Sequence, residues 1–249
     1  MNIPFFKQAG GAVRVSAGEA RAYLDANRPQ ARTLLDVRQD FEYAEGHLPG
    51  AMHIPLPELS ERLGELDPAK PVLTYCRSGK RSLAAANMLA GAGFAEVRSM
   101  DGGILAWEGA QAVGPADLGL DALLSAASVA DVLASAWGME LALEGFYEDL
   151  AGRAADVETA AVFRRLAGFE ERHRRVLLEL FVRQSEAGAD AAAFEARGRA
   201  LVAPGTLEGG VTAAEYLGQL QAPQNTGEAL ELAMAIEAQA FDLYSRRAR

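Results

Sequence analysis

The sequence has a single cysteine, Cys76, among its 249 residues. One cysteine excludes an internal disulfide and a Cys-x-x-Cys metal site, and a free thiol suits a reducing compartment. No uninterrupted apolar run approaches the roughly 18 residues of a membrane span, and residues 1–7 lack the apolar stretch of a signal peptide. Basic residues are in the minority, and the net charge of −10 argues against a nucleic-acid partner. We therefore expect a soluble, cytoplasmic protein with no membrane or nucleic-acid partner.

Half of the residues are hydrophobic, and their spacing divides the chain into two parts. In the first part, short strand-like runs alternate with helical patterns, which predicts a parallel α/β sheet. A segment rich in Gly and small residues follows, and strand signals then largely vanish. We predict an α/β domain over residues 1–112, a linker over 113–127 and an all-α helical domain over 128–249.

Cys76 lies between a buried strand-like run, Pro71–Tyr75, and a helical pattern that begins near Ser82. At such a turn, free backbone N–H groups and the helix dipole favour an anion. Arg77, Lys80 and Arg81 also favour the thiolate form of the cysteine. The ordinary alternative is a buried and inert cysteine. Three cations and a glycine within five residues of the sulfur indicate instead a nucleophilic thiol that handles anionic substrates.

Several segments in the first part resemble the rhodanese domain, in the order found in that family. They are Asp36-Val37-Arg38, Phe41-Glu42-Tyr43, Gly46–Ala51, Tyr75–Ser82, Gly93-Phe94 and Gly102–Trp107. The resemblance implies sulfur transfer with Cys76 as the nucleophile, which takes sulfane sulfur from thiosulfate or another persulfide donor. The resulting persulfide passes its sulfur to a thiol or to cyanide, and no cofactor is needed.

The same resemblance assigns roles to the loop after the cysteine. The backbone amides of Arg77, Ser78, Gly79, Lys80 and Arg81 would hold the persulfide, and the three cations would attract the oxyanion of a small anionic donor. Rhodanese-like phosphatases use a longer Cys-x5-Arg loop, whereas Cys76 and Arg81 form a Cys-x4-Arg loop. The shorter loop favours sulfur over phosphate.

Two histidines invite a Cys–His dyad, which we do not predict. His47 falls in a structural turn of the rhodanese-like motif, and His53 lies in an apolar strand-like run that is typical of core histidines. Asp36 and Arg38 are expected to support the sheet and its neighbouring loops.

The second part is helical and contains a weak internal repeat. Glu140 precedes Tyr147 by seven residues, and Glu237 precedes Tyr244 by the same interval, so each pair shares a helix face. A carboxylate on an apolar face is costly unless it is paired or binds a cation. Between these helices, Glu170-Glu171-Arg172-His173 places a glutamate and a histidine at the i, i+3 spacing of a Glu-x-x-His metal motif.

This part resembles the ferritin-like, rubrerythrin-type di-iron domains. The resemblance implies iron, with Glu140, Glu170, His173 and Glu237 as metal ligands and the two tyrosines beside the site. Such domains have a fourth helix with a second Glu-x-x-His motif, whereas this chain ends at Arg249, after its third long helix.

Three explanations can account for the missing fourth helix. The helix was lost by truncation, or a homodimer completes the bundle, or the domain binds no iron and serves as a dimerisation or partner-binding module. The alternatives to sulfur transfer are therefore a metal-binding or peroxide-reducing protein with a rhodanese module that delivers or senses sulfur, and a non-catalytic helical module. An ordinary helical bundle with solvent-facing glutamates is the simplest competing interpretation.

Overall fold

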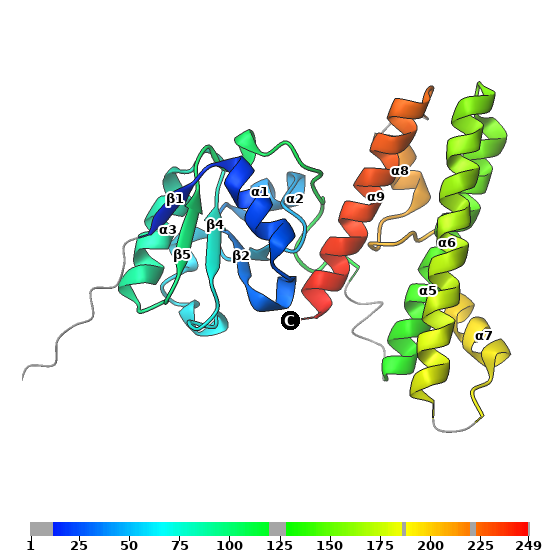
Figure 1. Ribbon diagram of the computed structural model, residues 1–249, viewed down its shortest axis with the longest axis horizontal. Helices are drawn as coiled ribbons and strands as arrows, with labels where there is room; N and C mark the ends of the chain where they lie inside the picture. The colour runs from blue at the N-terminus through cyan, green and yellow to red at the C-terminus, as the bar shows by residue number, and fades with distance from the viewer. Residues whose placement is uncertain (1–11, 120–127, 186–187, 220–222, 249) are drawn as a thin grey trace, which may run out of the picture. The chain divides into compact units, whose positions relative to one another are not determined.

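The computed structural model describes residues 12–119, 128–185, 188–219 and 223–248 (Figure 1). The chain divides into two compact units, of which the first ends at Ala116 and the second spans Asp117–Arg247. Part of the predicted linker, residues 120–127, lies outside the described residues. No helix in the described part of the chain combines the length and the apolar character that a membrane-spanning segment needs.

The first unit is built on a five-stranded sheet in which all strands are parallel. Its spatial order is β1-β5-β4-β2-β3. The strands are β1 (Val13–Val15), β2 (Thr33–Asp36), β3 (Met52–His53), β4 (Val72–Tyr75) and β5 (Val97–Met100). The predicted parallel α/β architecture is confirmed.

Helices cover both faces of this sheet (Figure 1). They are α1 (Ala17–Ala26), α2 (Asp40–Glu45) and α3 (Lys80–Gly91), with 3₁₀ turns at Pro29–Ala31, Leu56–Glu58, Leu63–Glu65 and Gly103–Ala106. Successive strand residues point to opposite faces. Leu35 and Val72 accordingly pack with α3, whereas Leu34 and Leu73 pack with α1 and α2. The central strands β2 and β4 are thus buried on both faces, which is why they are nearly continuous apolar runs in the sequence.

Among the described residues, the second unit is built from helices. Its elements are α5 (Val129–Arg153), α6 (Val157–Gln184), α7 (Ala191–Leu201), α8 (Ala213–Gln219) and α9 (Thr226–Arg247). Side chains cap the first three: Ser128, Asp156 and Asp190 each accept a hydrogen bond from the backbone N–H three residues later. These local signals mark where the three helices begin.

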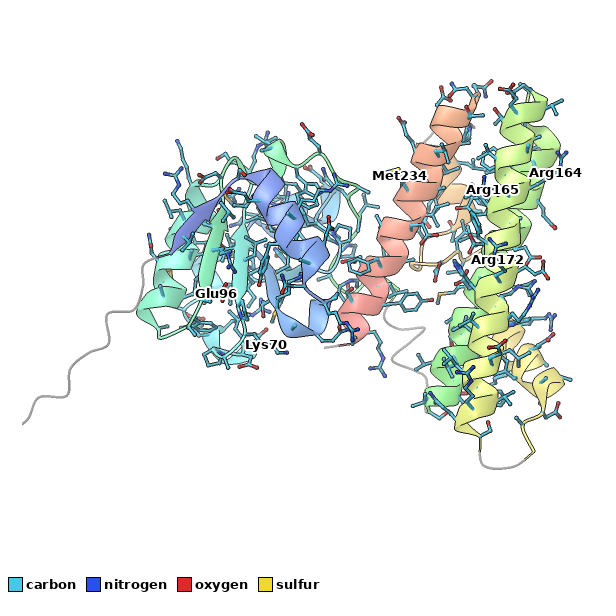
Figure 2. The ribbon with its side chains drawn as sticks, in the orientation of Figure 1. Lys70, Glu96, Arg164, Arg165, Arg172 and Met234 are labelled. Atoms are coloured by element: carbon cyan, nitrogen blue, oxygen red, sulfur yellow. The ribbon has the colours of Figure 1, made fainter. Side chains whose placement is uncertain are left out.

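The core of this unit lies where α5, α6 and α9 meet the turn before α8. It includes Leu143, Tyr147, Phe163, Ile236 and Leu207. Outside the core, α6 has a charged surface, and Figure 2 labels Arg164, Arg165 and Arg172 along it.

Candidate functional site

Cys76 lies directly after β4, at the carboxyl end of a central strand, and α3 begins four residues later at Lys80. Between them, Gly79 has a φ of +92°, in the left-handed region that glycine adopts without strain. A Cβ atom on Gly79 would lie 3.1 Å from the amide nitrogen of Gly102. The turn therefore needs glycine both for its backbone angle and for its close approach to the neighbouring loop.

The thiol of Cys76 is surrounded by hydrogen-bond donors. The amide of Gly79 donates to Sγ at 3.2 Å. Burial of Cys76, which is 1% exposed, opposes ionisation, but the polar groups around the sulfur (the amide and hydroxyl of Ser82 and the amides of Ser78 and Gly79) outweigh it. The pKa of the thiol is therefore lowered from its ordinary value of 9.0. Ser82 is a site residue that the sequence analysis did not single out, although it belongs to the same motif.

A second loop packs against the backbone of the cysteine. The amide of Ile104 donates to the carbonyl oxygen of Cys76 at 2.8 Å, and the amide of Leu105 donates to that of Arg77 at 3.2 Å. Gly103 has a φ of +58°, and a Cβ atom there would lie 2.2 Å from the carbonyl oxygen of Cys76. The glycines after β5 thus allow the two loops to touch.

The three cations of the loop differ in their surroundings. Arg81 donates two hydrogen bonds to the carboxylate of Glu42, at 2.6 and 2.7 Å, so its charge is largely neutralised. Arg77 and Lys80 are exposed, and neither forms an ion pair within the described ranges. The sequence predicts that all three attract a donor anion; in the structure Arg81 also supports the loop through Glu42, whereas Arg77 and Lys80 are exposed beside the cysteine.

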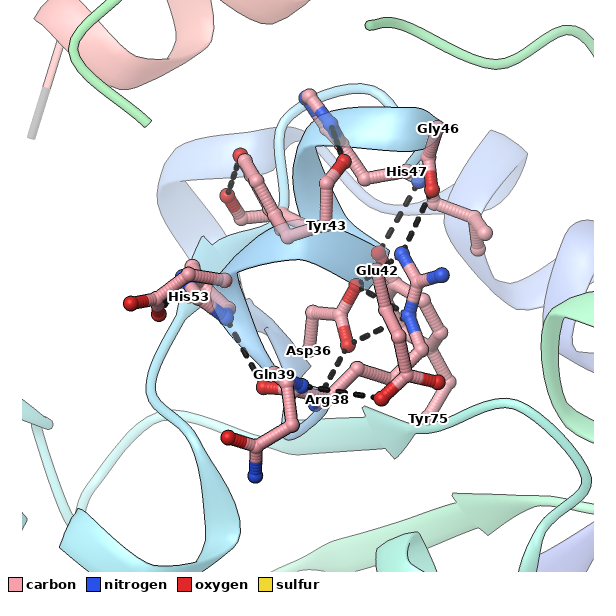
Figure 3. Close-up of polar contacts among 12 residues, drawn as sticks. Asp36, Arg38, Gln39, Glu42, Tyr43, Gly46, His47, His53 and Tyr75 are labelled. Atoms are coloured by element: carbon pink, nitrogen blue, oxygen red, sulfur yellow. Dashed lines mark hydrogen bonds and ion pairs between the residues drawn. The ribbon is translucent and has the colours of Figure 1, made fainter. Parts of the chain in front are cut away.

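Behind the loop, polar groups hold α2 against the sheet (Figure 3). Arg38 forms a buried ion pair with Asp36 at 2.6 Å and also donates to the carbonyl oxygen of Gly46 at 2.6 Å. The ring of His47 stacks on Tyr43, and its Nδ1 lies 2.9 Å from the carbonyl oxygen of Tyr43. His53 Nε2 lies 3.0 Å from the carbonyl oxygen of Arg38. Both histidines are engaged in packing contacts rather than with the Cys76 thiol.

In the second unit, three of the four predicted metal ligands come together. One ligand atom each of Glu140, Glu170 and His173 lies within 4.8 Å of the others. His173 Nδ1 is 2.8 Å from Glu170 Oε2 and 3.5 Å from Glu140 Oε1. Glu140 and Glu170 are 5% and 1% exposed, and Glu140 Oε2 has no hydrogen-bond partner within the described part of the chain. Burial, followed by the charges of Glu208 and Glu170, raises the pKa of Glu140 strongly.

The fourth predicted ligand, Glu237, is not part of this group of mutually close ligand atoms. Glu237 in α9 is exposed as a residue, but its carboxylate is partly shielded. Desolvation and the charge of Glu170 raise its pKa, and His173 lowers it. Burial is the main cause that raises the pKa values of the two predicted neighbours, Tyr147 and Tyr244. The next cause is a carboxylate charge, which comes from Glu170 for Tyr147 and from Glu208 for Tyr244.

One further carboxylate was missed by the sequence analysis. Glu208 belongs to the connection between α7 and α8 and is 6% exposed. The pKa of Glu208 is raised to about 7, mainly because burial disfavours its charged form. The Tyr244 hydroxyl opposes this rise, and the charges of Glu237 and Glu170 add to it. The connection has no helical periodicity that could reveal a buried face. The only available signal was an acidic residue followed by two glycines beside apolar Leu207 and Val211.

Comparisons with known proteins agree with the architecture of the first unit. Residues 16–110 match the model of the rhodanese-like domain family. The putative sulfurtransferase YtwF of Bacillus subtilis is 43% identical over 76 residues, which is 30% of this chain and 73% of that protein. A sulfurtransferase of Allochromatium vinosum is 38% identical over 74 residues, or 30% of this chain and 69% of that protein. The thiosulfate sulfurtransferase GlpE of Pseudomonas syringae is 35% identical over 82 residues, which is 33% of this chain and 77% of that protein.

Among solved structures, a rhodanese-related protein of Thermoplasma volcanium is 32% identical and covers 38% of this chain and 89% of its own, with a TM-score of 0.34. The chain belongs to the rhodanese-like family through residues 16–110. The family match ends before the helical unit, whose ferritin-like identity stays a prediction.

Proposed function

We propose that this chain is a sulfurtransferase that carries sulfane sulfur on Cys76. The observation that carries the proposal is the thiol itself, held at the end of β4 by the Gly79 amide and by Ser82, with a lowered pKa. A thiolate is the nucleophilic form of cysteine, and the same amides that stabilise it can stabilise a terminal persulfide sulfur. Relatives with this domain are named sulfurtransferases, which supports the reaction class.

The reaction has two displacement steps. The Cys76 thiolate attacks the outer sulfur of thiosulfate, the S–S bond of the donor breaks, and sulfite leaves with the bonding electron pair. An acceptor thiolate or cyanide then attacks the outer sulfur of the Cys76 persulfide, and Cys76 leaves as a thiolate. The exposed Arg77 and Lys80 attract the anionic donor, whereas Arg81 holds the loop through Glu42.

The test is the formation of thiocyanate from thiosulfate and cyanide by the full chain and by Cys76→Ser. We expect activity in the wild type and none in the variant, with unchanged circular dichroism and thermal unfolding. Thiocyanate formation that survives the substitution would contradict the proposal. Hydrolysis of p-nitrophenyl phosphate serves as the second assay, because activity there without thiocyanate formation would favour the phosphatase alternative.

We further propose that the helical unit binds a divalent metal cation at Glu140, Glu170 and His173. Two buried carboxylates side by side are costly. Within the described residues, the only basic group in ion-pair distance of either carboxylate is the half-exposed imidazole of His173. Glu140 Oε2 is buried without a hydrogen-bond partner, as expected for an atom whose partner is a cation. Carboxylate and imidazole donors suit Fe²⁺ and Mn²⁺. When bound, the metal would supply Lewis-acid or redox chemistry, and these three side chains would hold it.

Iron is the first metal to test, because the resemblance to ferritin-like domains implies it. We would measure metal content per chain, together with the mass in solution, on protein purified without chelators, and then titrate Mn²⁺. Metal that is lost in Glu170→Gln but retained in Cys76→Ser would support a separate centre. Absence of metal and of Mn²⁺ binding would contradict the proposal and leave the helices as a scaffold or a dimerisation module.

A further inference from the structure

Ser99 is a buried serine of β5 that contacts the first turn of α3. It is 0% exposed, and its register partner on β4 is Thr74. Its hydroxyl donates a hydrogen bond to the hydroxyl oxygen of Ser82 at 3.0 Å, across 17 positions of the chain. Ser82 is also 0% exposed. Hydroxyls that are removed from water need partners within the protein, so this contact is part of how the two serines are satisfied.

The hydrogen bond from Ser99 limits what the Ser82 hydroxyl can do. A serine hydroxyl carries a single proton. While its oxygen accepts from Ser99, Ser82 directs that proton to the carbonyl oxygen of Gly79 at 3.1 Å. The amide of the same glycine donates to Cys76 Sγ at 3.2 Å. Hydrogen bonds on either side of Gly79 thus connect β5 with the sulfur.

Gly79 is the member of this series that most needs to be held. Its φ of +92° lies in the left-handed region, which glycine enters and leaves at little cost. Its carbonyl oxygen accepts from the Ser82 hydroxyl and also from the amide of Leu83, at 3.2 Å. The direction of the Gly79 amide therefore depends on Ser82, and the direction of the Ser82 hydroxyl depends on Ser99.

Thr74 holds the same part of α3 through a different group. Its hydroxyl donates to the carbonyl oxygen of Ser82 at 2.9 Å and lies 3.1 Å from the carbonyl oxygen of Arg98. Thr74 thus acts on the backbone of the helix, whereas Ser99 acts on the Ser82 side chain. Removal of the Ser99 hydroxyl leaves the Thr74 contact in place, so the two effects can be separated.

We propose that Ser99 is a positioning residue for the Cys76 nucleophile and acts through the hydroxyl of Ser82. Donors that are oriented in advance stabilise the thiolate, and later a terminal persulfide sulfur, without rearranging during the reaction. The role of Ser99 in turnover rests on the proposed sulfur transfer. Its role in holding the thiolate does not depend on that function.

The test follows the rate of Cys76 alkylation by iodoacetamide as a function of pH, in the full chain. Ser99→Ala should move this profile to higher pH, in the same direction as Ser82→Ala. The rate at pH 7 should fall by about twofold to fivefold, because the thiolate loses part of its support. In a protein that already carries Ser82→Ala, the further change Ser99→Ala should have no effect, since the group that Ser99 orients is gone.

Thiocyanate formation gives a second measurement. Ser99→Ala should lower kcat by a similar factor and leave the KM for thiosulfate within about twofold of the wild type. The reason is that Arg77 and Lys80, the exposed cations of the loop, are unchanged, as is Arg81. Ser60→Ala, which alters an exposed serine of the same unit, is the matched control and should change neither kcat nor the alkylation profile.

Two results would overturn the inference. One is an alkylation profile of Ser99→Ala that coincides with the wild type. The other is a second shift when Ser99→Ala is added to Ser82→Ala, because a residue that only packs the core would act independently of Ser82. Ser99→Thr keeps the hydroxyl and should keep the wild-type profile, which guards against a folding defect in the alanine variant. An alanine-like profile in a folded Ser99→Thr protein would also contradict the role of the hydroxyl.

The inference and the proposed function fail in different ways. Alkylation reports on the thiol whether or not sulfur is transferred. If the wild type forms no thiocyanate but the variants shift as expected, sulfur transfer is wrong and the role of Ser99 stands. If the wild type is active and Ser99→Ala matches it in both assays, sulfur transfer stands and the role of Ser99 is wrong.

Discussion

The carboxylate of Glu42 in α2 accepts two hydrogen bonds from the guanidinium of Arg81 in α3, at 2.6 and 2.7 Å. The two residues are 39 positions apart in the chain. The Arg81 hydrogen bond is the largest cause that lowers the pKa of Glu42, to about 2. Since Arg81 lies in the first turn of α3, this pair holds the end of the Cys76 loop against α2.

Replacement of Glu42 by Gln should destabilise the first unit. The change leaves the guanidinium of Arg81 without a charged partner, at a cost of about 1.5–3 kcal/mol. Urea denaturation of the full chain, followed by hydrogen exchange in α2 and α3, measures the loss. Glu45→Gln, an exposed carboxylate on the same helix, should have no such effect. Equal effects of the two variants would show that the pair is not stabilising.

The same pair predicts a dependence on acid. The folded-state pKa of Glu42, about 2, lies below its ordinary value of 4.5. The stability from the pair is therefore present above pH 4.5 and is lost as the pH falls toward 2. The difference in unfolding free energy between the wild type and Glu42→Gln should shrink across this interval. A difference that stays constant from pH 5 to pH 2 would contradict the assignment.

Ser82→Ala should raise the pKa of the Cys76 thiol, because the Ser82 hydroxyl is one of the polar groups that lower it. The wild-type thiol ionises below its ordinary pKa of 9.0, so alkylation by iodoacetamide should rise with pH earlier than for a free cysteine. In the variant that rise moves to higher pH, and the rate at pH 7 should fall by about 3–10-fold. Ser78→Ala keeps the backbone amide and serves as the control. Identical pH profiles for all three proteins would exclude the role given to Ser82.

Gly103→Ala should disrupt the active-site loop. The new methyl group would lie 2.2 Å from the carbonyl oxygen of Cys76, at a φ of +58° that alanine rarely adopts. We expect a loss of at least about 2 kcal/mol in stability, together with loss of thiocyanate formation. Gly91→Ala adds the same methyl group at the end of α3, where nothing lies within 4 Å, and should be neutral. An active and stable Gly103→Ala protein would show that the two loops need not touch.

Lys80→Ala should weaken the binding of thiosulfate without preventing its reaction. An exposed charge near an anion contributes up to about 1 kcal/mol, so KM should rise by about twofold to fivefold, and less at high salt. Lys70, labelled in Figure 2, lies before the start of β4, whereas Cys76 and Lys80 follow its end. Lys70→Ala is therefore a matched control that removes the same charge away from the thiol. A KM that responds equally to both substitutions would point to net charge rather than to the loop.

The strands, the helix starts and the turn at Cys76 were predictable from the sequence because local interactions specify them. Apolar runs mark the central strands, which are buried on both faces, and Ser and Asp at helix starts accept hydrogen bonds from backbone amides within a few residues. The loop motif around Cys76 is continuous in the chain, so its chemistry could be read directly. The Glu-x-x-His spacing likewise placed Glu170 and His173 together on α6.

Tertiary structure alone decided which of these groups face one another. Arg81 is neutralised by Glu42, and Glu208 is buried by a turn that packs on α9. Glu237 has the spacing of a buried ligand, yet as a residue it is exposed. Such contacts join residues far apart in the chain, and burial of a charge depends on the elements packed around it. No local pattern of residues carries that information.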